Sequence, residues 1–296
     1  MPLADAPLWS LLGRAVAGLM LLVTAACGDP PTVPVEEWPA PNGTFVETWR
    51  DDFSGPADAA PDPARWNLEV RELWFNDELQ STTGERKNSY QDGSGNLVIK
   101  AIRENHVDAS GIPSAQPFTS ARLNTHGKLD QMYGRFEARI KLPAGGRGVW
   151  PAFWMLGSNI EDVGWPECGE IDILEMAGSK PNRVVGSLHA PGYYAGNAYH
   201  DHYDLPAGEF GDDFHVFTIE WTPEAIRWLL DGQEYFVKTA DAVRRSGRVW
   251  AYDTSLYLIL NISVGGIFDG DPAPDTLFPQ EMVVDYVSVS RFQASP

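Results

Sequence analysis

Three carboxylates fall within six residues in the stretch Gly169–Met176, which reads GEIDILEM. Glu170 and Asp172 are two residues apart, so on a β-strand their side chains point to the same face. On a regular strand Glu175 would point to the opposite face. One extra residue at Ile173–Leu174, a β-bulge, would return Glu175 to the first face, and bulges are common beside active sites. The pattern therefore predicts a bulged strand that carries three acids on one concave surface.

Acids placed this closely repel one another, which costs stability unless a site uses the repulsion. Carboxyl groups on one surface can act as proton donor, proton acceptor or nucleophile. The spacing ExDxxE alone also fits a solvated strand face, so the surrounding sequence has to decide between the two interpretations.

The composition bounds the class of protein. The chain has 296 residues, 43% hydrophobic and 21% charged, which suits one large or two small globular domains. The 11 Trp, 10 Tyr and 13 Phe fit either core packing or stacking on sugar rings. The net charge of −19 argues against nucleic acid, which needs a basic surface, and favours a neutral partner over a polyanion. Two cysteines, Cys27 and Cys168, make neither a disulfide framework nor a zinc site.

Residues 1–27 predict an export signal. Arg14 precedes the apolar run 15–26, which is too short for a comfortable membrane span. The run ends in VTAACG, which resembles a bacterial lipobox with Cys27 as the lipidated residue, although Thr24 stands where Leu is usual. The alternative is plain secretion after cleavage near Ala26. We expect an exported protein, either secreted or a cell-envelope lipoprotein attached to the membrane only through Cys27.

Residues 28–44 contain five prolines and predict a semi-rigid tether. From residue 45 to 294 the signals are short strands separated by Gly, Pro and Asp turns, with one short helical candidate at 240–246. The expected strands are 97–102, 135–142, 215–221, 225–230, 234–238, 256–264 and 282–289. Many short strands in one domain predict an all-β sandwich.

Eight blocks in this domain match one family in order. They are WRDDFSG (49–55), NDELQ (76–80), TSARLNT (119–125), YGRFEARIKLP (133–143), WPAFWML (150–156), WPECGEIDILE (165–175), LILNISVGG (258–266) and VDYV (284–287). The chain thereby resembles glycoside hydrolase family 16, and within it the laminarinase-like endo-β-1,3-glucanases, with Asp52 in place of the usual Glu. The resemblance implies a concanavalin A-like β-jelly roll with a concave substrate cleft.

The resemblance also implies a retaining mechanism, in which two carboxyl groups lie about 5 Å apart. It assigns Glu170 as the nucleophile and Glu175 as the acid/base. The charge of Asp172 between them should favour the protonated form of its neighbours, which an acid catalyst needs near neutral pH. We therefore expect three carboxyl groups that titrate as one coupled cluster.

Six further residues are candidates for sugar binding by resemblance: Trp165, Trp150, Trp154, Arg122, Asn76 and His189. Trp150 and Trp154 are four residues apart and share a strand face. For the tryptophans the alternative is core packing, for Arg122 a structural ion pair, and for His189 a turn cap. Cys168 is expected to be a small buried residue without a catalytic role.

Relatives of this family often bind a structural calcium ion on the convex face. The matching positions are the backbone carbonyls of Asp52 and Gly95 and the side chain of Asp285, and such oxygen ligands suit a hard cation. The alternative for Asp285 is a surface acid. Catalysis itself is expected to need no cofactor.

Three functions are compatible with these residues. The first is an endo-β-1,3-glucanase that acts as a monomer on a neutral β-glucan. The second is another enzyme of the same fold, such as a mixed-linkage glucanase, a galactan hydrolase or a transglycosylase. The ExDxxE spacing argues against lichenases and xyloglucan transferases, which resemble ExDxE, and the block 150–156 favours the laminarinase branch. The third is a non-catalytic glucan-binding protein, but such relatives typically lose the glutamates that this chain keeps.

Overall fold

The computed structural model describes residues 36–108 and 110–295. The predicted export signal, Cys27 and the first part of the predicted tether lie outside the described residues. Strands dominate the described part, with two short α-helices, α1 (Ile160–Val163) and α2 (Ala240–Arg245), and one 3₁₀ turn, η1 (Ala195–Asn197). None of the described helices is long and apolar enough to cross a membrane.

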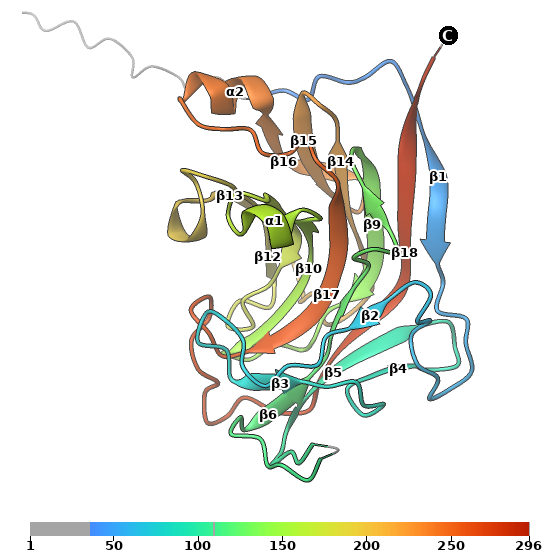
Figure 1. The fold of residues 1–296 in the computed structure, drawn as a ribbon, viewed down its shortest axis with the longest axis vertical. Coiled ribbons are helices and arrows are strands. Elements are labelled where there is room, and N and C mark those ends of the chain that lie inside the picture. Colours follow the sequence, from blue (N-terminus) through green and yellow to red (C-terminus); the bar gives the residue numbers. More distant parts are fainter. Residues whose placement is uncertain (1–35, 109, 296) are drawn as a thin grey trace, which may run out of the picture. The chain divides into compact units, whose positions relative to one another are not determined.

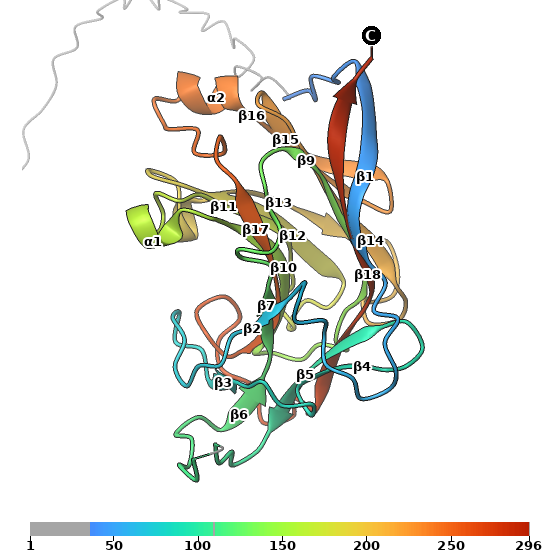
Figure 2. The ribbon, with the colours of Figure 1, turned by 45° about the vertical axis from the view of Figure 1, so that its right-hand side comes forward.

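Two sheets pack against each other as a sandwich (Figures 1 and 2). The larger sheet has the order β16 (Gln233–Thr239), β15 (Ala225–Leu230), β14 (His215–Trp221), β9 (Gly134–Lys141), β18 (Gln280–Ala294), β5 (Leu97–Arg103), β6 (Phe118–Ser120) and β3 (Gln80–Thr82), with β1 (Gly43–Asp51) beside β18 and β4 (Ser89–Gln91) beside β5. The smaller sheet has the order β13 (Tyr199–Asp204), β12 (Arg183–His189), β11 (Glu170–Glu175), β10 (Val149–Gly157), β17 (Leu256–Val264), β7 (Arg122–Asn124) and β2 (Asn67–Leu68), with β8 (Asp130–Gln131) beside β17.

The alternation that predicted strand 135–142 is visible in the burial of β9, where every second side chain is buried. Phe136, Ala138 and Ile140 enter one continuous core together with Phe153 and Leu260 of the smaller sheet. The sequence-predicted bounds of β14, β15 and β17 are confirmed, and α2 occupies the predicted helical segment. The predicted jelly-roll sandwich is confirmed.

Residues 36–38, in the middle of the predicted tether, touch the domain. The Glu36 carboxylate accepts hydrogen bonds from the backbone N–H (2.7 Å) and the hydroxyl (2.9 Å) of Thr239. The guanidinium of Arg227 lies 4.7 Å from the centre of the Trp38 ring. Residues 36–38 therefore lie along β15 and β16.

Candidate active site

The predicted bulge is present in β11. Asp172 pairs with Ser187 of β12 and Glu175 pairs with Val185, so three steps along β11 face two steps along β12. On the other side of β11, Phe153 pairs with Leu174 and Trp154 pairs with Asp172, which leaves Ile173 as the extra residue. The bulge returns Glu175 to the face that carries Glu170 and Asp172, whereas Ile171, Ile173 and Leu174 are buried in the core.

A tryptophan from the opposite sheet holds the backbone at the bulge. Trp228 of β15 is fully buried, and its Nε1–H donates a 2.8 Å hydrogen bond to the carbonyl oxygen of Asp172. A bulge disrupts the regular ladder, and a buried carbonyl without a partner is costly. Trp228 satisfies this carbonyl and so links the core to the orientation of the acidic strand.

Each of the two glutamates accepts one indole N–H. Trp165 Nε1 donates to Glu170 Oε2 at 2.9 Å, and Trp150 Nε1 donates to Glu175 Oε1 at 3.0 Å. An indole N–H can only donate, so each bond requires an acceptor oxygen and fixes the direction of its carboxyl group. Trp165 is 43% exposed and meets Tyr194 edge-on at 5.3 Å, which leaves ring surface open to a ligand.

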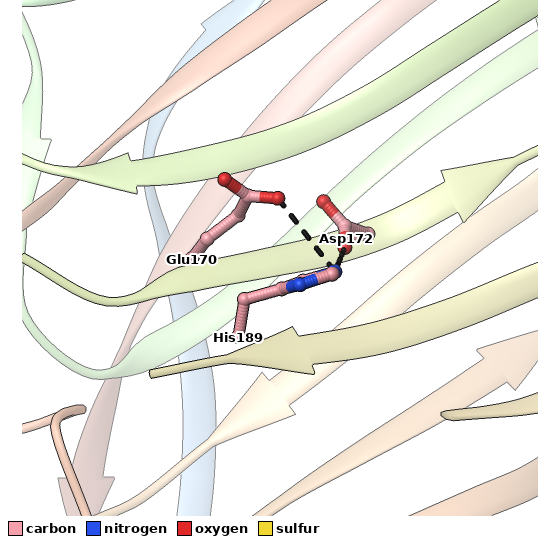
Figure 3. A group of neighbouring side chains, drawn as sticks. All are labelled: Glu170, Asp172 and His189. Carbon is pink, nitrogen blue, oxygen red and sulfur yellow. Dashed lines mark ion pairs between the residues drawn. The ribbon is translucent and has the colours of Figure 1, made fainter. Parts of the chain in front are cut away.

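Asp172 and His189 lie beside Glu170 (Figure 3). His189 Nε2 is 3.0 Å from Asp172 Oδ2 and 3.7 Å from Glu170 Oε1. The backbone N–H of Ala195 donates to His189 Nδ1 at 3.1 Å. Because Nδ1 must accept this bond, the proton of the neutral ring is on Nε2, facing the two carboxyl groups. Among the described residues no donor is aligned on Oδ2 of Asp172, so the His189 contact is electrostatic and not a directed hydrogen bond.

The side chains of Glu170, Asp172 and His189 are close enough together to be considered as three ligands of a metal ion. Their nearest ligand atoms lie within 4.8 Å of one another, and ligands around a tetrahedral zinc are roughly 3.3 Å apart. A metal would need the lone pair of His189 Nε2, however, and the displaced proton could not move to Nδ1, which already accepts from Ala195. The imidazole geometry therefore favours a proton-sharing cluster over a metal centre.

Burial raises the pKa of Glu170, Asp172 and Glu175, each to about 8. The negative charge of Asp172 raises the pKa of both glutamates further, while the indole bonds and His189 act in the opposite direction. Three acids this close share protons, so the cluster keeps protons near neutral pH. A protonated carboxyl group is what general-acid catalysis requires there.

This cluster should make folding stability depend on pH. A carboxyl group whose folded pKa is raised binds its proton more tightly in the folded state, so stability falls as pH rises from the unfolded value near 4.5 towards about 8. We expect Glu170→Gln and Glu175→Gln to unfold at higher temperature than the wild type at pH 8, with a smaller difference at pH 4.5. Thermal unfolding of the three proteins at both pH values measures this, and a difference that grows towards acid pH would contradict it.

Trp154 and Arg122 belong to a polar network beside the acids. Trp154 Nε1 donates to Asn261 Oδ1 at 2.7 Å. The Arg122 guanidinium lies between the rings of Trp74 (4.5 Å) and Trp154 (4.7 Å) and forms an ion pair with Glu69 at 3.0 Å. The ion pair considered for Arg122 is thus present, and it holds the guanidinium against two aromatic rings.

Asn76 and Cys168 occupy different surroundings. Asn76 is exposed, and its carbonyl accepts the N–H of Ile267 at 2.9 Å in the loop that follows β17. Cys168 is 1% exposed, and burial raises the pKa of its thiol to about 11. The prediction that Cys168 is buried is confirmed, and such a thiol is a poor nucleophile.

The sequence pattern does not single out several residues at the site. They are Trp228 behind the bulge, Trp74 beside Arg122, and the chain of side chains Asn261, Ser263 and Glu78. Asn261 and Ser263 carried a signal, because two polar residues alternate with apolar ones inside the otherwise apolar run 256–264. Trp228 carried none, because its role depends on a contact across the sandwich.

The positions expected for calcium are partly brought together. A Cβ added at Gly95 would lie 3.8 Å from the carbonyl oxygen of Asp52, so these two backbones are close. Asp285 accepts a 2.7 Å bond from Arg139, and both side chains are partly exposed. A cation would therefore have to share the Asp285 carboxylate with a guanidinium, through the second carboxylate oxygen.

Known proteins are similar to this chain in sequence and in fold. The family model "Glycosyl hydrolases family 16" matches residues 75–287. The chain is 39% identical to a "Beta-glucanase" of Rhodothermus marinus over 86% of this chain and 87% of that protein. It is 38% identical to a "Glucan endo-1,3-beta-glucosidase" of Cryptopygus antarcticus over 78% of this chain and 85% of that protein. The solved endo-β-1,3-glucanase of Pyrococcus furiosus superposes with a TM-score of 0.79 at 41% identity, covering 86% of this chain and 97% of that one. The chain therefore belongs to glycosyl hydrolase family 16.

Proposed function

We propose that this glycoside hydrolase is an endo-acting β-1,3-glucanase that cleaves laminarin-type glucan with retention of configuration. The observation that carries the proposal is the bulged strand β11, which puts Glu170 and Glu175 on one face with Asp172 between them. The relatives named for endo-1,3-β-glucan cleavage support the linkage.

In the first step, Glu170 attacks the anomeric carbon while the bond from that carbon to the leaving glucan oxygen breaks. Glu175 donates its proton to that oxygen, and a glycosyl ester of Glu170 forms. In the second step, Glu175 takes a proton from water, the water oxygen attacks the anomeric carbon, and Glu170 leaves as a carboxylate. Two displacements at one carbon return the original configuration.

Asp172 and His189 serve the nucleophile in this proposal. Asp172 is 2% exposed and so acts on its neighbours, not on bulk solvent. Its charge keeps a proton on the cluster, and the Nε2–H of His189 faces Glu170 and Asp172, which limits their repulsion. The coupled cluster shares its protons, so one glutamate can be ionised while the other holds a proton, as the proposed mechanism requires.

The sugar-binding surface is proposed around Trp165, Trp150, Trp154, Arg122 and Asn76. The open ring face of Trp165 suits the apolar face of a pyranose next to Glu170. The net charge of −19 and the acidic cluster both favour an uncharged polysaccharide.

Product analysis tests the proposed substrate. With laminarin we expect rapid release of reducing ends as oligosaccharides of mixed length, with slower release from lichenan and none from agarose; Glu170→Gln is the inactive control. Faster cleavage of lichenan would favour a mixed-linkage glucanase, and cleavage of agarose would favour a galactan hydrolase. Binding of laminarin without any cleavage would identify a glucan-binding protein and overturn the proposal.

We also propose that the chain is exported and held at the cell envelope by a lipid on Cys27, or released after cleavage near Ala26. The basis is the apolar run 15–26 followed by Cys27. Labelled palmitate incorporated into the wild type but not into Cys27→Ser would support the lipid anchor. Equal labelling of both would contradict it.

A structural calcium ion held by the carbonyls of Asp52 and Gly95 and by Asp285 is proposed for stability alone. We expect calcium to raise the melting temperature of the wild type by a few degrees and a chelator to reverse the effect, because an ion bound only to the folded state stabilises it. Asp285→Ala should abolish the response. An unchanged melting temperature in calcium and in chelator would exclude the site.

A further inference from the structure

One carboxylate in the loop after β17 is hydrogen-bonded to the segment before β10 and to the segment after β11. Asp269 Oδ2 accepts the backbone N–H of Gly148 at 2.7 Å and that of Ser179 at 3.0 Å, and Oδ1 accepts the Ser179 hydroxyl. Gly148 directly precedes β10, and Ser179 lies four residues after Glu175. Asp269 thus joins three segments at the end of the site where Glu175 lies.

The same loop packs on Trp150. The Phe268 ring is stacked on the Trp150 indole, with ring centres 5.0 Å apart and planes at 28°. Gly266 has φ +89°, and a Cβ there would come within 3.3 Å of the indole and 3.0 Å of the Asn76 carbonyl oxygen. Glycine therefore permits the close approach of this loop to Trp150.

The packed indole is the one that bonds Glu175. Trp150 Nε1 donates to Glu175 Oε1 at 3.0 Å. The χ2 torsion of a Trp side chain is broad, so packing against neighbouring groups is needed to keep the N–H in this direction. We propose that Phe268 and Asp269 are positioning residues, which hold Trp150 so that its N–H keeps Glu175 directed at the leaving-group oxygen. This inference rests on the proposed role of Glu175 as the acid/base.

A misplaced acid should matter most where the leaving group needs a proton. A 2,4-dinitrophenolate is stable enough to leave without a proton, whereas the oxygen of a sugar leaving group must be protonated. General-acid catalysis increases the rate by about 10²–10⁴-fold. The test compares kcat/KM, which reports the glycosylation step, for laminari-oligosaccharides and for 2,4-dinitrophenyl laminaribioside. Glu175→Ala is measured on both substrates as the reference.

We expect Phe268→Ala to lower kcat/KM for the oligosaccharide by about 10–100-fold and for the dinitrophenyl glycoside by less than about threefold. Asp269→Ala should show the same selectivity, because it removes both oxygens that accept the bonds from Gly148 and Ser179. Phe268→Trp should restore activity by restoring the stacked ring. Ile267→Ala is the matched control, because Ile267 belongs to the same loop, is 67% exposed and should leave both substrates unaffected.

Equal losses on the two substrates, or no loss in either variant, would overturn the inference. Phe268→Leu keeps the apolar bulk without the flat ring and gives the same test if the alanine variant does not fold. If Glu175→Ala itself shows no selectivity between the two leaving groups, the proposed acid/base assignment fails instead. The reference variant therefore separates failure of the positioning role from failure of the proposed function.

Discussion

Glu175→Ala is expected to lower kcat/KM on laminarin by about 10²–10⁴-fold, because the glucan leaving group then departs without a proton. Sodium azide should restore turnover of an activated aryl glycoside and give a glycosyl azide of retained configuration. Azide would enter the space left by the carboxyl group and attack the Glu170 ester without needing a base. Circular dichroism and thermal unfolding should report an intact fold.

The matched control is Glu170→Ala, which should lose on the order of 10⁴-fold or more, since no covalent intermediate can form. Azide added to this variant would attack the activated substrate directly and give the inverted product. The two variants thus differ in the stereochemistry of rescue. Near wild-type turnover in either variant, or retained product from Glu170→Ala, would reject the assignment.

The second large effect concerns Asp172→Asn. The burial of Glu175 and the negative charge of Asp172 both raise the pKa of Glu175. Removing the charge of Asp172 therefore lowers the pKa of Glu175. Glu175 then loses its proton at lower pH, and the basic limb of the kcat/KM profile moves to more acidic pH. At pH 8 we expect a loss on the order of tenfold or more, larger than the loss at pH 5.

A profile of kcat/KM from pH 4 to pH 9 measures this shift. Asn keeps the size of the side chain and its buried position, so the comparison isolates the charge. A basic limb that stays in place, or moves to higher pH, would contradict the electrostatic role of Asp172. Ser187→Ala is a useful control, because Ser187 of β12 is paired with Asp172 of β11 and carries no charge.

The position of the acids could be predicted because it follows from whether each residue has an odd or an even place along the strand. Side chains alternate along a strand, so ExDxxE requires one extra residue before three acids can share a face. The structure places that residue at Ile173, within the predicted pair. The same alternation puts Trp150 and Trp154 on one face, and their indole N–H groups donate to the polar side chains of Glu175 and Asn261.

The supporting contacts could not be predicted, because they join residues far apart in sequence. Trp228 reaches Asp172 from 56 residues away, and Arg122 meets Glu69 across 53 residues. Such pairs depend on how the sheets stack and on where the loops cross. The indole N–H of Trp150, a candidate for sugar binding, donates to Glu175, and this contact depends on the pairing of β10 with β11.

Trapping the covalent intermediate tests the central claim most directly. A 2-deoxy-2-fluoro laminaribioside with a dinitrophenolate leaving group forms the glycosyl ester quickly and hydrolyses it slowly, because fluorine destabilises both transition states. After peptic digestion, mass spectrometry should find the added disaccharide on Glu170, within the peptide that contains the bulge. An adduct on Asp172 or Glu175, or hydrolysis with inversion and no adduct, would contradict the account.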